Sequence, residues 1–316
     1  MRVMKGWKSL LGGGGGLLGG VIIDRFYLMD SREKTPIPGL PSLASVSAAE
    51  PYVESNPTNS LEKVERLIPE VKEGINRVSE IMKYGFPSLD TVRSRRDYVI
   101  SYDRRNRTPN WVFEHLTPES CRRNESVDRN LCEFKEDPSI HPFFRSQNKD
   151  YKYSGFDRGH LAAAGNHRQS QEHCDETFYL SNMSPQVGTG FNRDKWENLE
   201  WYVRKLAKRS RNVYICTGPL YLPRLEADGK NYVKYQVIGK NNVAVPTHFF
   251  KIVVTESEKD SPLDLESFVL PNERIDDSIP LSHFYVPPDS VERASGLLFF
   301  DKLSKTRLRS INGKIL

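Results

Sequence analysis

Apolar residues recur at helical spacing in two stretches of the chain. From residue 61 to residue 82 they alternate at three- and four-residue steps, which predicts helix, and Pro69 inside this stretch predicts a kink or two short helices. Residues 193 to about 208 carry the second stripe and predict one amphipathic helix with Asn192 at its N-cap position. The buried stripe predicted for this second helix is Trp196, Leu199, Val203 and Leu206.

From about residue 84 the rest of the pattern consists of short β-branched and aromatic runs. Gly, Pro and Asn bound these runs, as is typical of strands separated by turns. The predicted strands are 97–102, 111–114, 177–180, 212–216, 232–238 and 249–254. Strand and helix do not alternate regularly and no glycine-rich phosphate loop occurs, which disfavours a doubly wound parallel sheet. We therefore predict an α+β fold built on a mainly antiparallel sheet.

The same patterns divide the chain into three parts. Residues 31–59 are rich in Pro and Ser, which is typical of a linker and separates the first residues from the folded part. We predict a targeting segment over 1–48, a linker with the amphipathic helical segment over 49–83, and a folded domain over 84–316. The 61–82 stripe is more typical of a packing face than of a partner site.

The first 23 residues carry Arg2, Lys5 and Lys8, and no acidic residue precedes Asp24. A basic, acid-free start is typical of a mitochondrial presequence, whereas a charged end followed by the apolar run 9–23 also suits a secretory signal or an uncleaved anchor. That run of 15 residues is shorter than the ~20 residues that span a bilayer as a helix. We therefore favour mitochondrial targeting, and we expect no stable transmembrane span in the mature protein.

Composition and charge narrow the class of partner only slightly. The 316 residues are 37% hydrophobic and 28% charged, enough apolar material to bury a core. Lys and Arg number 46 against 41 Asp and Glu, a net charge of +5. This basic excess favours polyanions without identifying one. Arginine-rich clusters at 93–107 and 204–211 are as typical of a solvated face as of a binding site.

The four cysteines are Cys121, Cys132, Cys174 and Cys216. They show no C-x-x-C pairing and no histidine at zinc spacing, which argues against a structural zinc site. Four cysteines are too few to hold together a domain of this size, so the chain does not need an oxidising compartment to fold. One disulfide remains an open alternative.

Candidate chemistry gathers around His160, which ends the sequence Asp157-Arg158-Gly159-His160. Arg158 either binds a phosphate or pairs with Asp157, and Gly159 permits close approach of another backbone. Asn192 lies 32 positions after His160 (192 − 160). A returning strand around 177–182 would bring the two together in a strand–strand–helix unit, with His160 on the first strand.

The residue types in this unit suit phosphodiester hydrolysis. A neutral imidazole at His160 can take a proton from water as the water attacks phosphorus. The amide oxygen of Asn192 suits Mg²⁺, which prefers oxygen ligands and keeps several waters. Glu200 follows Asn192 by eight positions, about two helical turns, so it either faces the same site or is a surface carboxylate. We expect the other histidines to be structural or exposed: His115, His141, His167, His173, His248 and His283.

The order of these motifs resembles the DNA/RNA non-specific nucleases of the ββα-metal fold. The resemblance rests on Asp157–His160, on Ser-Asn-Met-Ser-Pro-Gln at 181–186 and on the sequence that follows Asn192, and it extends from about residue 84 to 300. It implies His160 as general base and Asn192 as the single protein ligand of Mg²⁺, and Glu200 matches a family carboxylate near the metal. We predict Arg158 and Glu200 as further catalytic residues, and Mn²⁺ as the alternative ion. The 50–83 stretch has no counterpart in the family.

The resemblance also implies an activity and a location. It implies an endonuclease that cuts DNA and RNA with little sequence preference, because contacts to phosphate carry no base information, and that leaves 5′-phosphate and 3′-hydroxyl ends. It further implies a homodimer in the mitochondrial intermembrane space that reaches the nucleus and fragments DNA during cell death.

Three alternatives remain open. They are a catalytically silent nucleic-acid binder, a secreted nuclease of the same fold, and an exonuclease relative. The sequence N-x-S/T begins at Asn106, Asn124 and Asn182. A glycan on Asn182 would crowd the proposed site, which disfavours secretion.

Overall fold

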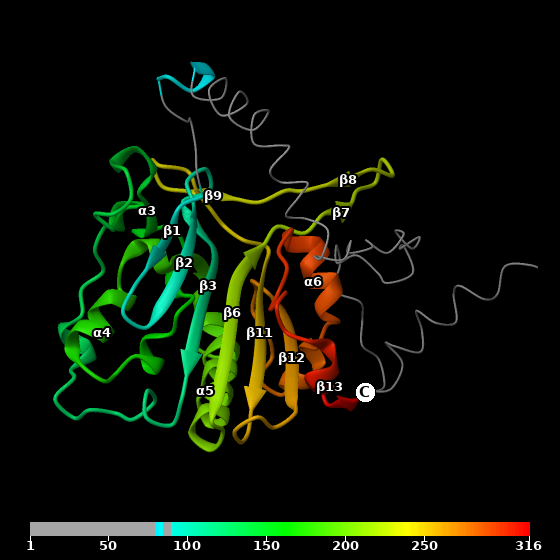
Figure 1. Ribbon diagram of the computed structural model, residues 1–316. Helices are drawn as coiled ribbons and strands as arrows, with labels where there is room; N and C mark the ends of the chain where they lie inside the picture. Colours follow the sequence, from blue (N-terminus) through cyan, green and yellow to red (C-terminus); the bar gives the residue numbers. More distant parts are fainter. Residues whose placement is uncertain (1–79, 85–89) are drawn as a thin grey trace, which may run out of the picture.

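A large, mainly antiparallel sheet forms the centre of the computed structural model, which describes residues 80–84 and 90–316. Its strands are β1 (Val92–Ser94), β2 (Tyr98–Asp103), β3 (Thr108–Leu116), β6 (Asn212–Leu220), β11 (His248–Glu256), β12 (Leu263–Pro271), β13 (Leu308–Ile311) and β14 (Lys314–Ile315). They lie in the order β1-β2-β3-β6-β11-β12-β13-β14 (Figure 1). Every neighbouring pair is antiparallel except β12 with β13. The predicted α+β fold with a mainly antiparallel sheet is therefore confirmed.

Smaller elements surround this sheet. Three strand pairs lie outside it: β4 (Phe156–His160) with β5 (Met183–Val187), β7 (Arg224–Leu225) with β8 (Asn231–Tyr232), and β9 (Val237–Ile238) with β10 (Val243–Ala244). The helices of the described residues include α3 (Asn148–Tyr151), α4 (Gln171–Thr177), α5 (Lys195–Arg209) and α6 (Pro288–Ser295). Short helical turns are η3 (Arg129–Leu131), η4 (Pro142–Phe144), η5 (Ala164–Asn166), η6 (Leu180–Asn182), η7 (Gly188–Asn192), η8 (Leu281–Phe284) and η9 (Lys305–Arg307).

The sheet is covered on both faces, and the alternation along β11 shows how. Phe249 and Val253 belong to the core on one face, while Ile252 and Val254 belong to the core on the other, as expected when successive side chains of a strand point to opposite sides. Helix α5 contacts β6 and β11 on the first face, and α6 contacts β6 from the second (Figure 1). Strands buried on both faces are rich in apolar residues, and the aromatic and β-branched run at 249–254 lies within β11.

Helix α5 forms where the apolar stripe predicts it. Trp196, Leu199 and Val203 are fully buried in the first core, and Leu206 belongs to the same core with slightly more exposure. Glu197 in the first turn and Arg209 in the last carry the charge signs that the helix dipole favours. The helix begins at Lys195 with Asp194 as N-cap residue, so the predicted N-cap role of Asn192 is wrong. Asn192 instead ends the turn η7.

The turn η7 separates β5 from α5 and depends on one glycine. Gly190 has a φ of +88°, a conformation that side chains rarely adopt, and a Cβ there would lie 2.4 Å from Cγ of Arg274. The backbone N–H of Gly190 donates to the carboxylate of Asp194. This loop turns the chain between strand and helix and places Asn192 two residues before the helix cap.

Two predicted strands differ from the structure. The predicted strand 177–180 is wrong, because Thr177 ends α4 and Leu180 begins the turn η6. Phe178 and Leu180 are buried, and a short apolar run does not distinguish a strand from a buried helix end. The predicted strand 232–238 is also wrong, because only its two ends pair, the first as β8 and the second as β9.

Two predicted segments lie wholly or almost wholly outside the residues that the structure describes. The predicted targeting segment 1–48 and nearly all of the 49–83 segment lie outside the described residues. Within the described part of the chain, no helix is both long enough and apolar enough to cross a membrane.

Candidate active site

A cleft of about 830 Å³ lies beside the β4–β5 pair and the start of α5. The predicted site residues His160, Arg158, Asn192 and Glu200 all line it. Its other lining residues are Arg129, Phe134, Asn148, Tyr151, Lys152, Phe156, Asp157, Ala164, Gly165, Arg168, Arg193, Glu197 and Arg204. The strand–strand–helix unit thus gathers these four side chains at one place, although its second strand is Met183–Val187 and not the predicted one.

His160 is the last residue of β4 and pairs with Met183 of β5. The two strands approach closely because Gly159 has no side chain: a Cβ there would lie 2.0 Å from Oε1 of Gln186. Gln186 is itself fully buried. The glycine before the histidine is therefore required for the close packing of β4 against β5, the strand pair that carries His160.

The imidazole of His160 sits between two aromatic rings. Its centroid lies 5.7 Å from that of Phe134 and 4.8 Å from that of Phe178, the latter in an edge-on arrangement. The side chain is 9% exposed, and its buried Nε2 has no hydrogen-bond partner in the described part of the chain. Apolar walls therefore hold the ring, and its Nε2 is left without a protein partner.

Burial and nearby cations keep His160 neutral. Desolvation is the main cause, and the positive charges of Arg129, His167 and Arg158 add to it, so that the pKa of His160 falls to about 3. The imidazole is therefore in the neutral form, which a general base requires, at any physiological pH. The low pKa also means that the free protein strongly disfavours the imidazolium that proton transfer produces.

Asn192 is held by a carboxylate on the neighbouring strand. Its Nδ2 donates to Oδ2 of Asp157 at 3.0 Å, and Arg193 donates to both oxygens of the same carboxylate. Partial burial opposes the ionisation of Asp157, but the hydrogen bonds from Arg193 and Asn192 outweigh it and lower its pKa. Because a carboxylate only accepts, the amide nitrogen of Asn192 must face Asp157, and Oδ1 has no protein partner within the described ranges.

Glu200 lies on α5 and lines the cleft together with Asn192, as the two-turn spacing predicts. Its side chain is 16% exposed, and the nearest cation is Arg204, with Nη1 3.9 Å from Oε2. Burial raises the pKa of Glu200 to about 7, against the opposing charges of Lys251 and Arg204. Glu200 is therefore a shielded carboxyl inside the cleft and not a surface carboxylate.

The side chains of the cleft fit a hard cation held mainly by water. Among residues 80–84 and 90–316, no three His, Cys, Asp or Glu side chains gather as a metal-binding group. The oriented Oδ1 of Asn192 could supply one oxygen ligand, and Glu197 and Glu200 line the same cleft. Mg²⁺ is commonly bound through one or two protein oxygens together with waters and phosphate, so this set suits it.

The cleft carries an excess of positive charge. Six basic residues line it against the acidic residues Asp157, Glu197 and Glu200, and the basic ones are Arg129, Lys152, Arg158, Arg168, Arg193 and Arg204. Arg158 does not pair with Asp157: its Nη1 donates to Oδ1 of Asn148 at 2.6 Å, and its guanidinium lies 4.0 Å over the ring of Phe134. The cleft therefore suits a polyanionic backbone.

The arginine clusters seen in the sequence mostly lie elsewhere. Arg95 pairs with Asp137, and Arg96 pairs with Glu172 at 2.7 Å. Within the cluster at 204–211, Arg204 is the member that lines the cleft. Sequence reasoning missed Arg129 and Arg168, because each stands apart from the clusters and only the path of its loop brings it to the cleft.

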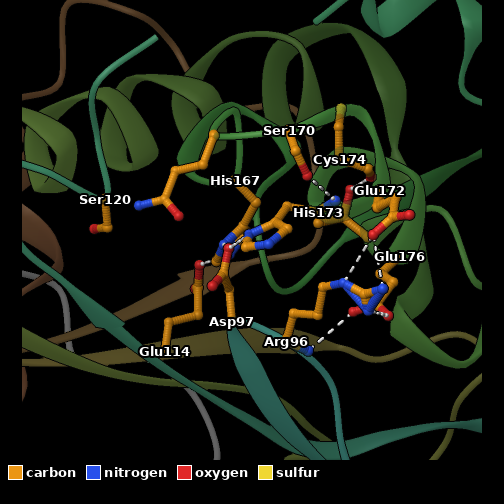
Figure 2. Close-up of polar contacts among 12 residues, drawn as sticks. Arg96, Asp97, Glu114, Ser120, His167, Ser170, Glu172, His173, Cys174 and Glu176 are labelled. Carbon is orange, nitrogen blue, oxygen red and sulfur yellow. Dashed lines mark hydrogen bonds and ion pairs between the residues drawn. The ribbon is translucent and has the colours of Figure 1, made fainter. Parts of the chain in front are cut away.

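A polar cluster of side chains surrounds His167 (Figure 2), and the neighbouring residues Ala164, Gly165 and Arg168 line the cleft. Nε2 of the buried His167 lies 2.9 Å from Oε1 of Glu114, and Nδ1 lies 3.4 Å from Oδ2 of Asp97, which also contacts His173. Burial alone would lower the pKa of His167, but the bonds to Asp97 and Glu114 raise it to about 9. Asn166 donates to Glu114 at 2.8 Å. We call this set the Glu114–His167 cluster; it anchors the 164–168 segment.

Asn182, which begins one of the N-x-S/T sequences, is fully buried. Its amide exchanges hydrogen bonds with the backbone of Ala162 and donates to the carbonyl oxygen of Thr177. The side chain is thus committed to holding the connection between β4 and β5. A glycan could not be placed there without disrupting these bonds.

Three comparisons with known proteins indicate the same family for this chain. Residues 77–306 match the family described as DNA/RNA non-specific endonuclease. The mitochondrial endonuclease G of Caenorhabditis elegans is 58% identical over 240 residues, covering 76% of this chain and 78% of that protein. The human mitochondrial endonuclease G is 56% identical over 220 residues, covering 70% and 73%.

A solved structure supports the same relationship. It is described as the crystal structure of the EndoG/EndoGI complex, a study of the mechanism of EndoG inhibition. The similarity to it has a TM-score of 0.70 with 65% sequence identity, and covers 76% of this chain and 97% of that one.

Proposed function

This chain belongs to the family of DNA/RNA non-specific endonucleases, and we propose that it is a Mg²⁺-dependent member with His160 as general base and Asn192 as metal ligand. The family prediction is confirmed, and so are the endonuclease activity and the mitochondrial location. The observation that carries the proposal is the presence, in one basic cleft, of an unpaired imidazole and an amide oriented by a carboxylate.

The protein side chains divide the work of hydrolysis. His160 takes the proton from a water molecule that attacks phosphorus. Arg129 and Arg158 stand near the imidazole, and a phosphate bound between them would offset their positive charge. The same phosphate would raise the pKa of His160 toward the working pH, where a general base is most effective. Substrate binding thereby prepares the base.

Asn192 and Glu200 organise the other side of the cleft. Asn192 would hold the metal through Oδ1, and the bond to Asp157 keeps that atom oriented. When bound, the metal supplies charge stabilisation for the phosphate and the leaving oxygen. Glu200 accepts hydrogen bonds from water in the cleft and so helps to orient it. Mn²⁺ has similar ligand preferences and is the alternative ion.

We extend the proposal to product, assembly and location. The products carry 5′-phosphate and 3′-hydroxyl ends, and the enzyme acts as a homodimer on both DNA and RNA. It resides in the intermembrane space and reaches the nucleus when DNA is fragmented during cell death. Residues 1–48 act as the targeting segment, 49–83 as linker and helical segment, and 84–316 as the nuclease domain. The similarity to relatives named as mitochondrial endonuclease G supports these points.

The experiment uses closed circular DNA, so that exonuclease action gives no signal. Cleavage should require Mg²⁺ and stop with EDTA. His160→Ala should reduce cleavage by roughly 10²–10⁴, the usual contribution of a positioned base. DNA affinity should stay within a few-fold, because His160 is neutral in the free protein.

His115→Ala is the matched control, because His115 is exposed on β3 and does not line the cleft. It should leave cleavage and binding unchanged. Equal losses of binding and cleavage in His160→Ala would assign His160 to substrate binding or folding. Undiminished cleavage would overturn the mechanism, and binding without any cleavage by the native protein would identify a silent binder.

A further inference from the structure

Two of the cysteines meet side by side. Sγ of Cys132 lies 3.2 Å from Sγ of Cys174, and both are thiols in this structure. The other two cysteines are in different surroundings, since Cys121 packs against the core that contains α5 and Cys216 belongs to the core on the opposite face of the sheet. Cys132 and Cys174 are therefore a distinct pair.

The two thiols come from different elements and differ in exposure. Cys174 is fully buried on α4 and belongs to an apolar cluster with Ala164 and Phe178. Cys132 follows the turn η3, is partly exposed, and accepts a hydrogen bond from Nε2 of Gln171 at 3.2 Å. A reagent in solution can therefore reach the thiol of Cys132, whereas the adjacent thiol of Cys174 is shielded from solvent.

We propose that Cys132 and Cys174 form a disulfide when a small-molecule disulfide of the glutathione class oxidises the protein. A disulfide has an S–S length of about 2.0 Å, so the two sulfur atoms must approach by roughly 1 Å. The thiolate of Cys132 attacks one sulfur of the oxidant, forms a mixed disulfide and releases one thiol. The thiolate of Cys174 then displaces the second thiol.

This exchange is balanced. The two protein thiols lose two protons and two electrons, and the oxidant gains them and leaves as two thiols. Burial, with contributions from Asp175 and Cys174, raises the pKa of Cys132. Few thiolates therefore exist at neutral pH, and the uncatalysed reaction should accelerate as the pH rises.

The disulfide would link the residue after η3 to helix α4, and β4 lies between these two elements in the sequence. It closes the chain from Cys132 to Cys174, a span that contains all of β4 and therefore His160. Phe134, two residues after Cys132, contacts the His160 ring, and Phe178, four residues after Cys174, contacts it from another side. The disulfide would thus fix two walls of the imidazole pocket relative to each other, and it would restrict the unfolded chain.

The test compares the full-length protein treated with glutathione disulfide at pH 8.5 and with dithiothreitol. After oxidation, alkylation and mass spectrometry should find two thiols fewer than the four of the reduced protein, and peptide mapping should recover a Cys132–Cys174 link. The melting temperature should rise by roughly 5–10 °C, and dithiothreitol should reverse the rise.

Substitutions separate this link from unspecific oxidation. Cys132→Ser should abolish both the link and the rise in melting temperature, while Cys121→Ser should retain both. Because Cys132 is partly exposed, its serine variant is expected to fold, and circular dichroism checks this. Four free thiols after oxidation, a mixed disulfide that stops at Cys132, or a loss of two thiols that persists in folded Cys132→Ser would each overturn the proposal.

Discussion

Asn192 donates a hydrogen bond to Asp157 at 3.0 Å, and this contact joins two segments that are 35 positions apart in the chain. It decides which end of the amide faces the cleft, because the carboxylate accepts only from the nitrogen. Asp157 also binds Arg193, so its charge stays in place when a ligand enters. The amide of Asn192, the proposed metal ligand, is therefore oriented by a partner outside its own turn.

Removing that partner should weaken metal binding without removing the ligand. Asp157→Ala frees the amide of Asn192 to rotate, so the Mg²⁺ concentration for half-maximal cleavage should rise by roughly 10-fold or more. Asp157→Asn should have a smaller effect, because its amide oxygen still accepts the bond, and Asn192→Ala a larger one. Metal titrations of cleavage at fixed DNA concentration measure all three.

Asp264→Ala is a matched control, since Asp264 also pairs with an arginine, Arg309, on β13 at the far side of the sheet. Its metal titration should equal that of the native protein. An unchanged titration in folded Asp157→Ala would show that orientation of Asn192 does not limit metal affinity.

The protonation of His160 should depend on a bound phosphate. In the free protein its pKa is about 3, so the imidazole should show no titration between pH 5 and pH 8. A nucleotide carrying a phosphate should raise that pKa by offsetting Arg129 and Arg158. Proton NMR of the imidazole, assigned by comparison with His160→Ala, measures both states. A free-state titration near pH 6.5 would contradict the burial argument.

The same depressed pKa has a consequence for stability. The unfolded imidazole binds a proton below about pH 6.5, whereas folded His160 does not until about pH 3. The contribution of neutral His160 is therefore present above pH 6.5 and is lost as the pH falls toward 3. The native protein should lose stability across this interval more steeply than His160→Ala, which urea unfolding at several pH values measures.

The stability that the Glu114–His167 cluster provides should depend on pH in the opposite sense to that of His160. Its hydrogen bonds raise the pKa of His167 to about 9, so the stability it provides is complete below about pH 6.5 and is lost as the pH rises through 9. His167→Gln leaves Glu114 buried without its cation and should cost about 3–5 kcal/mol near neutral pH. That cost should shrink at pH 9.5.

Urea unfolding of both proteins at pH 6.5, 8 and 9.5 tests this prediction. His248 provides the comparison, because it is also buried but burial lowers its pKa to about 4. His248→Gln should therefore lack the decline at high pH. An equal cost for His167→Gln at all three pH values would mean that packing, and not the charge of His167, stabilises the cluster.

Arg168 should contribute to binding of the nucleic-acid backbone. It lines the cleft, and its buried Nε has no hydrogen-bond partner within the described residues. Arg168→Ala should weaken binding of DNA and RNA alike, and the slope of log affinity against log salt should fall by about 1. Fluorescence anisotropy with a catalytically inactive His160→Ala background measures both effects.

Arg211→Ala is the control for this experiment, because Arg211 is exposed and lies outside the cleft. It should leave the salt slope unchanged. If Arg168→Ala changed affinity for one sequence and not for others, Arg168 would read bases and not phosphates.

The spacing of residues along the chain predicted helix α5 and several side chains of the site. The stripe of α5 follows from spacing alone, and Gly159 beside His160 indicates the close approach of β4 to β5. Glu200 faces the cleft with Asn192 because both belong to one short turn and helix. For α5 and Glu200 the deciding spacing lies within a single turn and helix, whereas Gly159 makes its close contact with Gln186 on β5.

The features that the sequence patterns did not predict have different causes. Asn192 and Asp194 are both residue types that cap helices, but the helix begins after Asp194, and the side chain of Asn192 donates to Asp157 on β4. Arg129 and Arg168 reach the cleft by way of irregular segments, for which no periodicity exists. The run at 177–180 has strand-like residues, but Thr177 closes a helix by donating to the carbonyl oxygen of Cys174.

The last strands protect the edge of the sheet. β13 pairs with β12 only at Leu263–Leu265, after which Asn312 bonds the N–H of Ser267 and Val286 donates to its carbonyl oxygen. These contacts occupy hydrogen-bonding groups of β12 that would otherwise be free, and a free strand edge can pair with another molecule. Residues beyond 306 lie outside the family match, yet a nuclease truncated there would expose this edge and aggregate instead of remaining in solution.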